Sequence, residues 1–216
     1  MASKTAASET GDPLLLTPGP LTTSKSVKEV MVHDWGSRDA TFIRINQSVL
    51  TGLVDIIGGG SEFVTVPMQG SGTFAVEAML TTFVPPKGKC LVLINGAYGQ
   101  RARKILEIAR RQIVVHETPE DTPPDLQKVD ALLERNKDIG HVFAVYCETT
   151  SGILNPIAEI ARLVENHGRR LLVDAMSALG ALPLDCRRVA FDAVAASYGS
   201  ANVLDKDGFL DLVSSE

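Results

Sequence analysis

Residues 68–73 read Met-Gln-Gly-Ser-Gly-Thr and stand just before a helical pattern, a place where an anion could bind. Glycine lets a ligand approach the backbone closely, and Ser71 and Thr73 add hydroxyl groups. The first turn of the helix adds backbone N–H groups without partners and a partial positive charge. The segment suits a phosphate group, although a tight turn with a serine or threonine helix cap has the same composition.

The same segment fits a second motif, because Gly70-x-Gly72-x-x-Ala75 has the spacing of the dinucleotide fingerprint. That fingerprint expects an acid roughly 20 residues further on, to hold a ribose. The next strand pattern ends in Asn95 instead, and the strand that should precede the fingerprint is not in its usual place. We therefore rank a nicotinamide or flavin site below a site for a phosphate alone.

An aromatic ring and a group of hydroxyls follow two other apolar runs. Tyr98 stands between Gly96 and Gly99 after residues 90–94, and its ring could lie flat on a planar cofactor. Thr150 belongs to the run Glu-Thr-Thr-Ser-Gly after residues 141–147, where hydroxyls could bond a ligand oxygen. A tyrosine that covers the core and a hydroxyl-rich turn are the alternatives for these two segments.

Asp174 ends the apolar run Arg-Leu-Leu-Val-Asp at 170–174. An acid at the end of a buried strand is costly unless it is paired, and a cationic ring nitrogen would pair it. Taken alone, Asp174 would more readily be read as the cap of a following turn. Other candidate groups are weaker: the four histidines lack metal-ligand spacing, there is no G-x-S-x-G motif, and Arg101 and its neighbours suit a solvated helix face.

These loops need a scaffold, and the sequence predicts one in which short apolar strands alternate with amphipathic helices. Such alternation is typical of an α/β fold with a largely parallel sheet flanked by helices, whose ligands bind at the carboxyl ends of the strands. Helices are expected at about 40–57, 76–83, 102–109, 125–133 and 157–164, and strands at 63–67, 90–94, 112–116, 141–147, 170–174 and 191–197.

Composition narrows the class of protein further. The 216 residues carry a net charge of −5, which gives no basic footprint for nucleic acid, and no apolar run is long enough to span a bilayer. Cys90, Cys147 and Cys186 make an odd number, so we expect a reducing, cytoplasmic setting. Residues 1–12 are predicted to form a disordered tail, 13–202 an arm and an incomplete cofactor-binding domain, and 203–216 a divergent acidic tail.

The motifs occur in an order that resembles the class V aminotransferases, which are fold-type I pyridoxal-phosphate enzymes. The resemblance covers about 13–202. Its motifs are TPGPLTTSKSVKEVMVHDWGSRD (17–39), QGSGTFAVEAML (69–80), NGAYGQR (95–101), ETTSGILNP (148–156), VDAMSALGALPLD (173–185) and SAN (200–202).

The resemblance implies pyridoxal 5′-phosphate as cofactor and a role for each matched residue. Ser71, Gly72 and Thr73 would hold the phosphate and Tyr98 would stack on the ring. The hydroxyl of Thr150 would bond near the phenolic oxygen. The catalytic role would fall to Asp174, which would pair with the ring nitrogen and keep it protonated.

The resemblance also implies substrates and partners. Related enzymes transfer the amino group of 2-aminoethylphosphonate to pyruvate and give phosphonoacetaldehyde and alanine. Residues 33–38 would lie near the substrate, with Arg38 or Arg44 as candidates for anion contact. A homodimer is expected for the full-length family, with no nucleic-acid or membrane partner. Alanine–glyoxylate or serine–pyruvate transamination is the alternative reaction.

One position departs from the family pattern. Ser-Ala-Asn is normally followed at once by the Schiff-base lysine, but the next residue here is Val203, and Lys206 comes three residues later. Valine has no amine with which to bind the cofactor or move a proton. The family's C-terminal small domain also has no counterpart in the sequence. We therefore expect this chain to be inactive, and a non-catalytic fragment is the competing hypothesis.

Overall fold

The computed structural model describes residues 10–16 and 22–197, which fall into two compact units. Unit 2 comprises Met68–Leu179 and Cys186–Ser197 and contains every predicted cofactor contact. The described residues outside it belong to unit 1. No helix in the described part of the chain is both long and apolar enough to cross a membrane.

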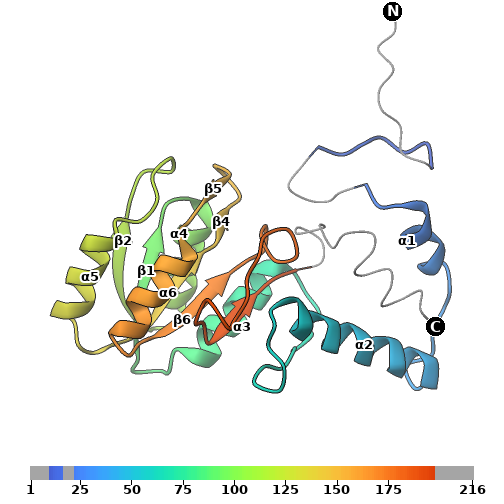
Figure 1. Cartoon of the computed structure of the whole chain (residues 1–216), viewed down its shortest axis with the longest axis horizontal. Coiled ribbons are helices and arrows are strands. Elements are labelled where there is room, and N and C mark those ends of the chain that lie inside the picture. Colours follow the sequence, from blue (N-terminus) through green and yellow to red (C-terminus); the bar gives the residue numbers. More distant parts are fainter. Residues whose placement is uncertain (1–9, 17–21, 198–216) are drawn as a thin grey trace, which may run out of the picture. The chain divides into compact units, whose positions relative to one another are not determined.

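A five-stranded parallel sheet forms the centre of unit 2 (Figure 1). Its strand order is β2-β1-β3-β6-β7, so the chain first adds a strand on one side of β1 and then continues on the other. The point where the order reverses, between β1 and β3, is where ligands bind in such sheets. The strands are β1 (Lys89–Ile94), β2 (Gln112–Glu117), β3 (Ile139–Val145), β6 (Arg170–Asp174) and β7 (Ala193–Ala195).

Four helices accompany this sheet: α3 (Gly72–Phe83), α4 (Ala97–Ile108), α5 (Leu126–Arg135) and α6 (Ile157–Asn166). Helices α3 and α4 bury their apolar residues with one face of the sheet, where Phe143, Val145 and Leu172 are almost fully buried. Because Val145 and Asp174 are partners across β3 and β6, the Asp174 side chain lies on this same face. Burial of the fifteen side chains of this cluster therefore fixes the strand end that carries Asp174.

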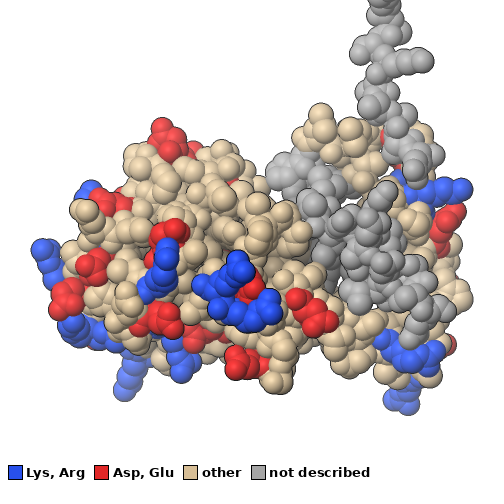
Figure 2. Space-filling view, viewed as in Figure 1, with Lys and Arg blue, Asp and Glu red and all other residues tan. Residues whose placement is uncertain are grey.

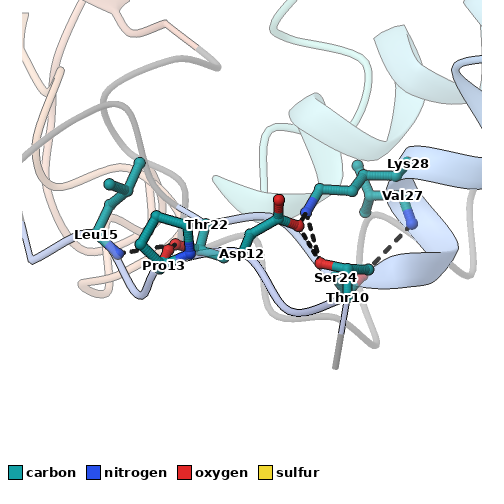
Figure 3. A network of polar contacts seen from close by, with 8 residues as sticks. All are labelled: Thr10, Asp12, Pro13, Leu15, Thr22, Ser24, Val27 and Lys28. Carbon is teal, nitrogen blue, oxygen red and sulfur yellow. Dashed lines mark hydrogen bonds and ion pairs between the residues drawn. The ribbon is translucent and has the colours of Figure 1, made fainter. Parts of the chain in front are cut away.

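Unit 1 contains α1 (Lys25–Val30) and α2 (Ala40–Ile56). The predicted tail 1–12 lies partly outside the described residues, but Thr10 and Asp12 are described. Both bond the ammonium group of Lys28 on α1, as Figure 3 shows. The hydrogen bond and charge of Lys28 lower the pKa of Asp12.

The predicted helices and the parallel sheet are confirmed, and two predicted strands need correction. Residues 63–67 form no strand. Val64 and Val66 are exposed, and the Thr65 hydroxyl donates to the carbonyl of Leu50 at 2.9 Å. The residue types favour a strand, but no neighbouring strand pairs with this segment among the described residues. The run 141–147 is interrupted at Tyr146: β3 ends at Val145, and a short hairpin of β4 (Cys147–Glu148) and β5 (Ile153–Leu154) follows.

Charged residues on the surface of unit 2 are mixed in sign. On the face drawn in Figure 2, basic side chains lie beside acidic ones. Ion pairs such as Lys137–Glu134 at 2.9 Å and Arg162–Glu159 at 3.3 Å join them along the helices. These exposed pairs contribute little stability. Because both signs of charge are mixed on this face, the charges do not indicate a binding surface.

Candidate functional site

The start of α3 carries the predicted phosphate contacts. Ser71 is the helix cap, and its Oγ accepts a hydrogen bond from the N–H of Phe74 at 3.3 Å. Among the described residues, no acceptor is bonded to the backbone N–H groups of Gly72 and Thr73. The helix therefore presents two unpaired donors and its positive end at this point.

Arg101 on α4 reaches the same place. Its Nη1 donates to Thr73 Oγ1 at 2.9 Å, and its guanidinium carbon lies 4.8 Å from the centre of the Tyr98 ring. Because Thr73 Oγ1 accepts from Arg101, its own proton is left to donate elsewhere. The prediction of a solvated position for Arg101 is right about exposure, but the residue belongs to the candidate site.

Gly72 lies against the loop that follows β6. A Cβ at this position would stand 2.7 Å from Met176 Sδ and 3.3 Å from Ser197 Oγ. No side chain fits there unless Met176 moves. The absence of a side chain at Gly72 thus brings the start of α3 to the loop that begins at Asp174.

Asp174 is one of two buried acids among the described residues, with 3% of its surface exposed. Its Oδ1 accepts from the N–H of Met176 at 3.0 Å, which is the turn-cap geometry that the sequence also allowed. No donor among the described residues bonds Oδ2. Burial raises the pKa of Asp174 to about 6; the negative charge of Glu148 adds to the rise, and the Met176 N–H and Arg101 oppose it.

Glu148 on β4 is the second buried acid, with none of its surface exposed. Its Oε2 accepts from the N–H of Tyr98 at 3.3 Å. Its Oε1 accepts from the hydroxyl of Thr150 at 2.9 Å and from the N–H of Thr150 at 3.4 Å. Glu148 therefore connects the tyrosine loop after β1 with the hydroxyl loop after β3.

Two further contacts hold these loops. Thr149 Oγ1 and Ser177 Oγ are 2.6 Å apart and join the hydroxyl loop to the loop after β6. Asn95, directly before Gly96, forms a reciprocal amide pair with buried Asn155. These contacts gather three of the predicted segments at the carboxyl ends of β1, β3 and β6, and the bond from Arg101 to Thr73 joins the start of α3 to them.

The sequence predicts cofactor contacts at Ser71, Gly72, Thr73, Tyr98, Thr150 and Asp174, and these stay predictions. It does not indicate the residues that connect them in the structure. From the sequence, Arg101 is expected on a solvated helix face and Glu148 in a hydroxyl-rich turn. A signal was available for Glu148: an acid that directly follows a long apolar run tends to be buried. For Arg101 the only signal was its position one helical turn after Tyr98.

The remaining candidates lie in unit 1 or outside the described residues. Arg38 and Arg44 belong to unit 1, and their contact with substrate remains a prediction. Residues 200–202, Val203 and Lys206 lie outside the described residues. Among the described residues, no three His, Cys, Asp or Glu side chains are grouped so that they could hold a metal ion.

Comparison with known proteins assigns the chain to a family. Residues 33–198 match the family model described as aminotransferase class-V, so the chain belongs to this family. It is 52% identical over 190 residues to the 2-aminoethylphosphonate–pyruvate transaminase of Pseudomonas fluorescens (strain Pf0-1), covering 88% of this chain and 52% of that protein. The corresponding protein of Pseudomonas entomophila (strain L48) is 51% identical over 187 residues, covering 87% of this chain and 51% of that protein. The chain thus spans about half the length of these relatives.

Solved structures share the fold at lower identity. Pyridoxamine–pyruvate aminotransferase from Mesorhizobium loti matches with a TM-score of 0.80 and 24% identity, over 89% of this chain and 49% of that one. Alanine–glyoxylate aminotransferase from Nostoc sp. matches with a TM-score of 0.79 and 24% identity, over 86% and 49%. These likenesses establish the α/β fold and leave the choice of substrate open.

Proposed function

We propose that unit 2 binds pyridoxal 5′-phosphate. The phosphate would lie against the free N–H groups of Gly72 and Thr73 and the hydroxyls of Ser71 and Thr73. Tyr98 would stack on the ring, and Thr150 would bond its phenolic oxygen. When bound, this cofactor supplies an electron sink for carbanion chemistry.

The observation that carries the proposal is the unpaired oxygen of Asp174. An acid buried at a strand end raises the free energy of the folded chain unless a positive group pairs with it. A protonated ring nitrogen at Oδ2 would supply that charge, and it would lower the raised pKa of Asp174. Asp174 would in turn hold the proton on the ring nitrogen.

We further propose that the full-length relatives' reaction is the ancestral activity: transfer of an amino group from 2-aminoethylphosphonate to pyruvate, which gives phosphonoacetaldehyde and alanine. Identity near 52% with two transaminases of this name supports this donor. Alanine–glyoxylate or serine–pyruvate transamination has weaker support, because the solved structure with such a name is only 24% identical. A homodimer and a cytoplasmic location are part of the same proposal.

For this chain we propose cofactor binding without turnover. Val203 stands where the family pattern has its lysine and offers no amine. The test is to add pyridoxal 5′-phosphate to the 216-residue chain, treat one half with borohydride and dialyse both halves. We expect saturable binding, loss of the cofactor from both halves, and no alanine from pyruvate and 2-aminoethylphosphonate.

Each part of the proposal can fail separately. No saturable binding would contradict the cofactor site. Cofactor retained only after borohydride would show a covalent link to a lysine, and peptide mapping would show whether that lysine is Lys206. Alanine formation would contradict the proposed lack of turnover.

A further inference from the structure

Helix α5 begins at a backbone N–H group whose partner is a histidine ring on the sheet. The two prolines before Asp125, the cap of α5, have no N–H to donate. The N–H of Asp125 donates to Nε2 of His116 on β2 at 3.0 Å. The carboxylate of Asp125 accepts from the N–H groups of Gln127 and Lys128, so it serves the first turn of the helix.

The sequence of α5 explains why a distant ring takes this place. In a capping box, a Glu or Gln three positions after the cap accepts the N–H of the cap residue. Lys128 stands at that position here, and its ammonium group has only donors. The ammonium group instead forms an ion pair with the carboxylate of Asp125 at 3.4 Å. His116 thus supplies the acceptor that the start of the helix lacks.

The bond also defines the protonation state of His116. Nε2 accepts a hydrogen bond, so it carries no proton, and the ring is neutral. The residue is buried, with 7% of its surface exposed. Burial lowers the pKa of His116; the negative charge of Asp125 opposes this change, and the positive charge of Lys128 adds to it.

The other neighbours of the ring are not charged. Leu93 is the partner of His116 on β1, and the residues that α5 buries beside the sheet are Val129 and Leu133. Glu117 follows His116 on β2, and its side chain therefore points to the opposite face of the sheet. Within the described part of the chain, Asp125 and Lys128 are thus the charged groups that face the ring.

The loop at residues 118–125 is held against the sheet at both of its ends. The N–H of Thr118 donates to the carbonyl of Ile94 at 2.9 Å, and Nδ2 of Asn95 donates to the carbonyl of Thr122 at 3.3 Å. The bond to His116 holds the other end, where α5 begins. This loop therefore borders the segment that leads from Asn95 to Tyr98.

We propose that His116 is a pH-sensitive switch, whose neutral ring holds residues 118–125 against the sheet and whose protonated ring releases them. An imidazolium has two donors and no acceptor, so it would meet the N–H of Asp125 donor to donor. The carboxylate of Asp125 could hold an imidazolium only by leaving the N–H groups that it caps. The inference goes beyond the proposed function and does not depend on it.

The direction of the pH effect follows from the lowered pKa of His116. In the released loop the ring has its ordinary pKa, about 6.5, so the released state binds the proton more readily. Stability from the closed loop is therefore fully present above that ordinary pKa. It is lost as the pH falls through the lower pKa of the closed state.

Three variants test the switch. H116Q replaces the ring with a side-chain carbonyl that accepts a hydrogen bond and does not titrate. K128Q keeps His116 and places an uncharged acceptor three residues after the cap, where it can bond the N–H of Asp125. K128R is its matched control, because arginine, like lysine, has only donors.

The measurement is cleavage of the folded 216-residue chain by a glutamate-specific protease at about pH 7.5 and about pH 5. Glu120 is exposed in the loop, and its cleavage rate follows the population of the open loop. Glu159 on α6 lies outside the loop and reports on wider unfolding. The ratio of the two rates in one sample removes the effect of pH on the protease itself.

At the higher pH we expect ratios within about twofold of one another in all four chains. At the lower pH the ratio should rise about fivefold in the native chain and in K128R. In H116Q and K128Q it should rise less than about twofold, because an acceptor that does not titrate remains.

Two results would overturn the inference. An equal rise in K128Q and K128R would show that the bond at the N–H of Asp125 does not control the loop. A lower ratio in the native chain at acid pH would show that the imidazolium pairs with the Asp125 carboxylate and holds the loop. If H116Q does not fold, K128Q and K128R still decide, because position 128 is exposed.

Discussion

The side-chain amides of Asn95 and Asn155, sixty residues apart in the sequence, hydrogen-bond each other in both directions at 2.8 and 3.1 Å. Asn155 also donates to the carbonyl of Val145 at 2.8 Å, at the end of β3. Both amides are buried, with 2% and 3% of their surface exposed. The pair fixes the loop that leads to Tyr98 against the segment that follows the hydroxyl loop.

We therefore predict that Asn155→Ala destabilises the chain by about 2–3 kcal/mol, because the amide of Asn95 stays buried without its partner. Urea unfolding followed by circular dichroism measures the change. Asn46→Ala removes an exposed amide from α2 and serves as the control, with an expected effect within about 0.5 kcal/mol. Equal effects of the two substitutions would contradict a structural role for the pair.

A second prediction follows from the buried carboxylate of Asp174. Its pKa is raised from 3.8 to about 6 in the folded chain, mainly by burial. Stability from this group is therefore greatest below the unfolded pKa and is lost as the pH rises through the folded pKa. The amide that D174N introduces does not titrate, so the stability of this variant relative to the native chain should rise by about 1.4 kcal/mol from about pH 5 to about pH 8.

Chemical denaturation of both proteins at several pH values measures this difference without any ligand. A constant difference across the range would mean that Asp174 keeps an ordinary pKa. The same substitution should weaken binding of pyridoxal 5′-phosphate, since an amide cannot pair with a cationic ring nitrogen.

A third prediction concerns Arg101, which contacts both Thr73 and Tyr98. Arg101→Ala should weaken binding of pyridoxal 5′-phosphate about tenfold, because a cation and the orientation of the Thr73 hydroxyl are lost beside the phosphate. Binding of pyridoxal, which has no phosphate, should change less than about threefold.

Arg103→Ala is the matched control. Arg103 lies on the same helix but pairs with Glu107 at 2.9 Å, away from the site. Fluorescence titration of both ligands gives the four affinities. Equal losses for the two ligands in Arg101→Ala would show that the residue acts through the ring rather than the phosphate.

A fourth prediction compares two glycines. Gly96→Ala would place a methyl group within 2.4 Å of Glu148 carbon atoms and should destabilise the chain by about 3 kcal/mol. Gly140→Ala in β3 meets no atom within 4 Å and should leave stability unchanged or raise it by up to about 1 kcal/mol. Thermal melts of the two variants are sufficient, and a stable Gly96→Ala would mean that Glu148 can move aside.

Much of the fold could be predicted because each strand of the sheet is a compact apolar run between helical patterns, as at 90–94 and 170–174. Residues 63–67 show the limit of this reasoning. Their aromatic and β-branched residues favour a strand, but pairing depends on whether another strand lies beside it. Local sequence holds no information on that neighbour, nor on the order of the strands.

The site divides in the same way. Ser71, Tyr98, Thr150 and Asp174 could be located because each follows a strand or begins a helix, and parallel strands end at one edge. The contacts of Glu148 with Tyr98 and of Arg101 with Thr73 could not be assigned, because these pairs are 50 and 28 residues apart along the chain. Such contacts arise from the register of the sheet, which becomes visible only in the folded chain.

The division into two units has a practical consequence for optical measurements. The single tryptophan, Trp35, belongs to unit 1 and lies edge-on to His33, with 4.1 Å between the ring centres. Tyr98 and Tyr146 belong to unit 2. Indole emission therefore reports on the unit without the cofactor contacts, and two of the chain's three tyrosines report on the unit that has them. One heated sample monitored at both bands would reveal whether the halves melt together or in turn.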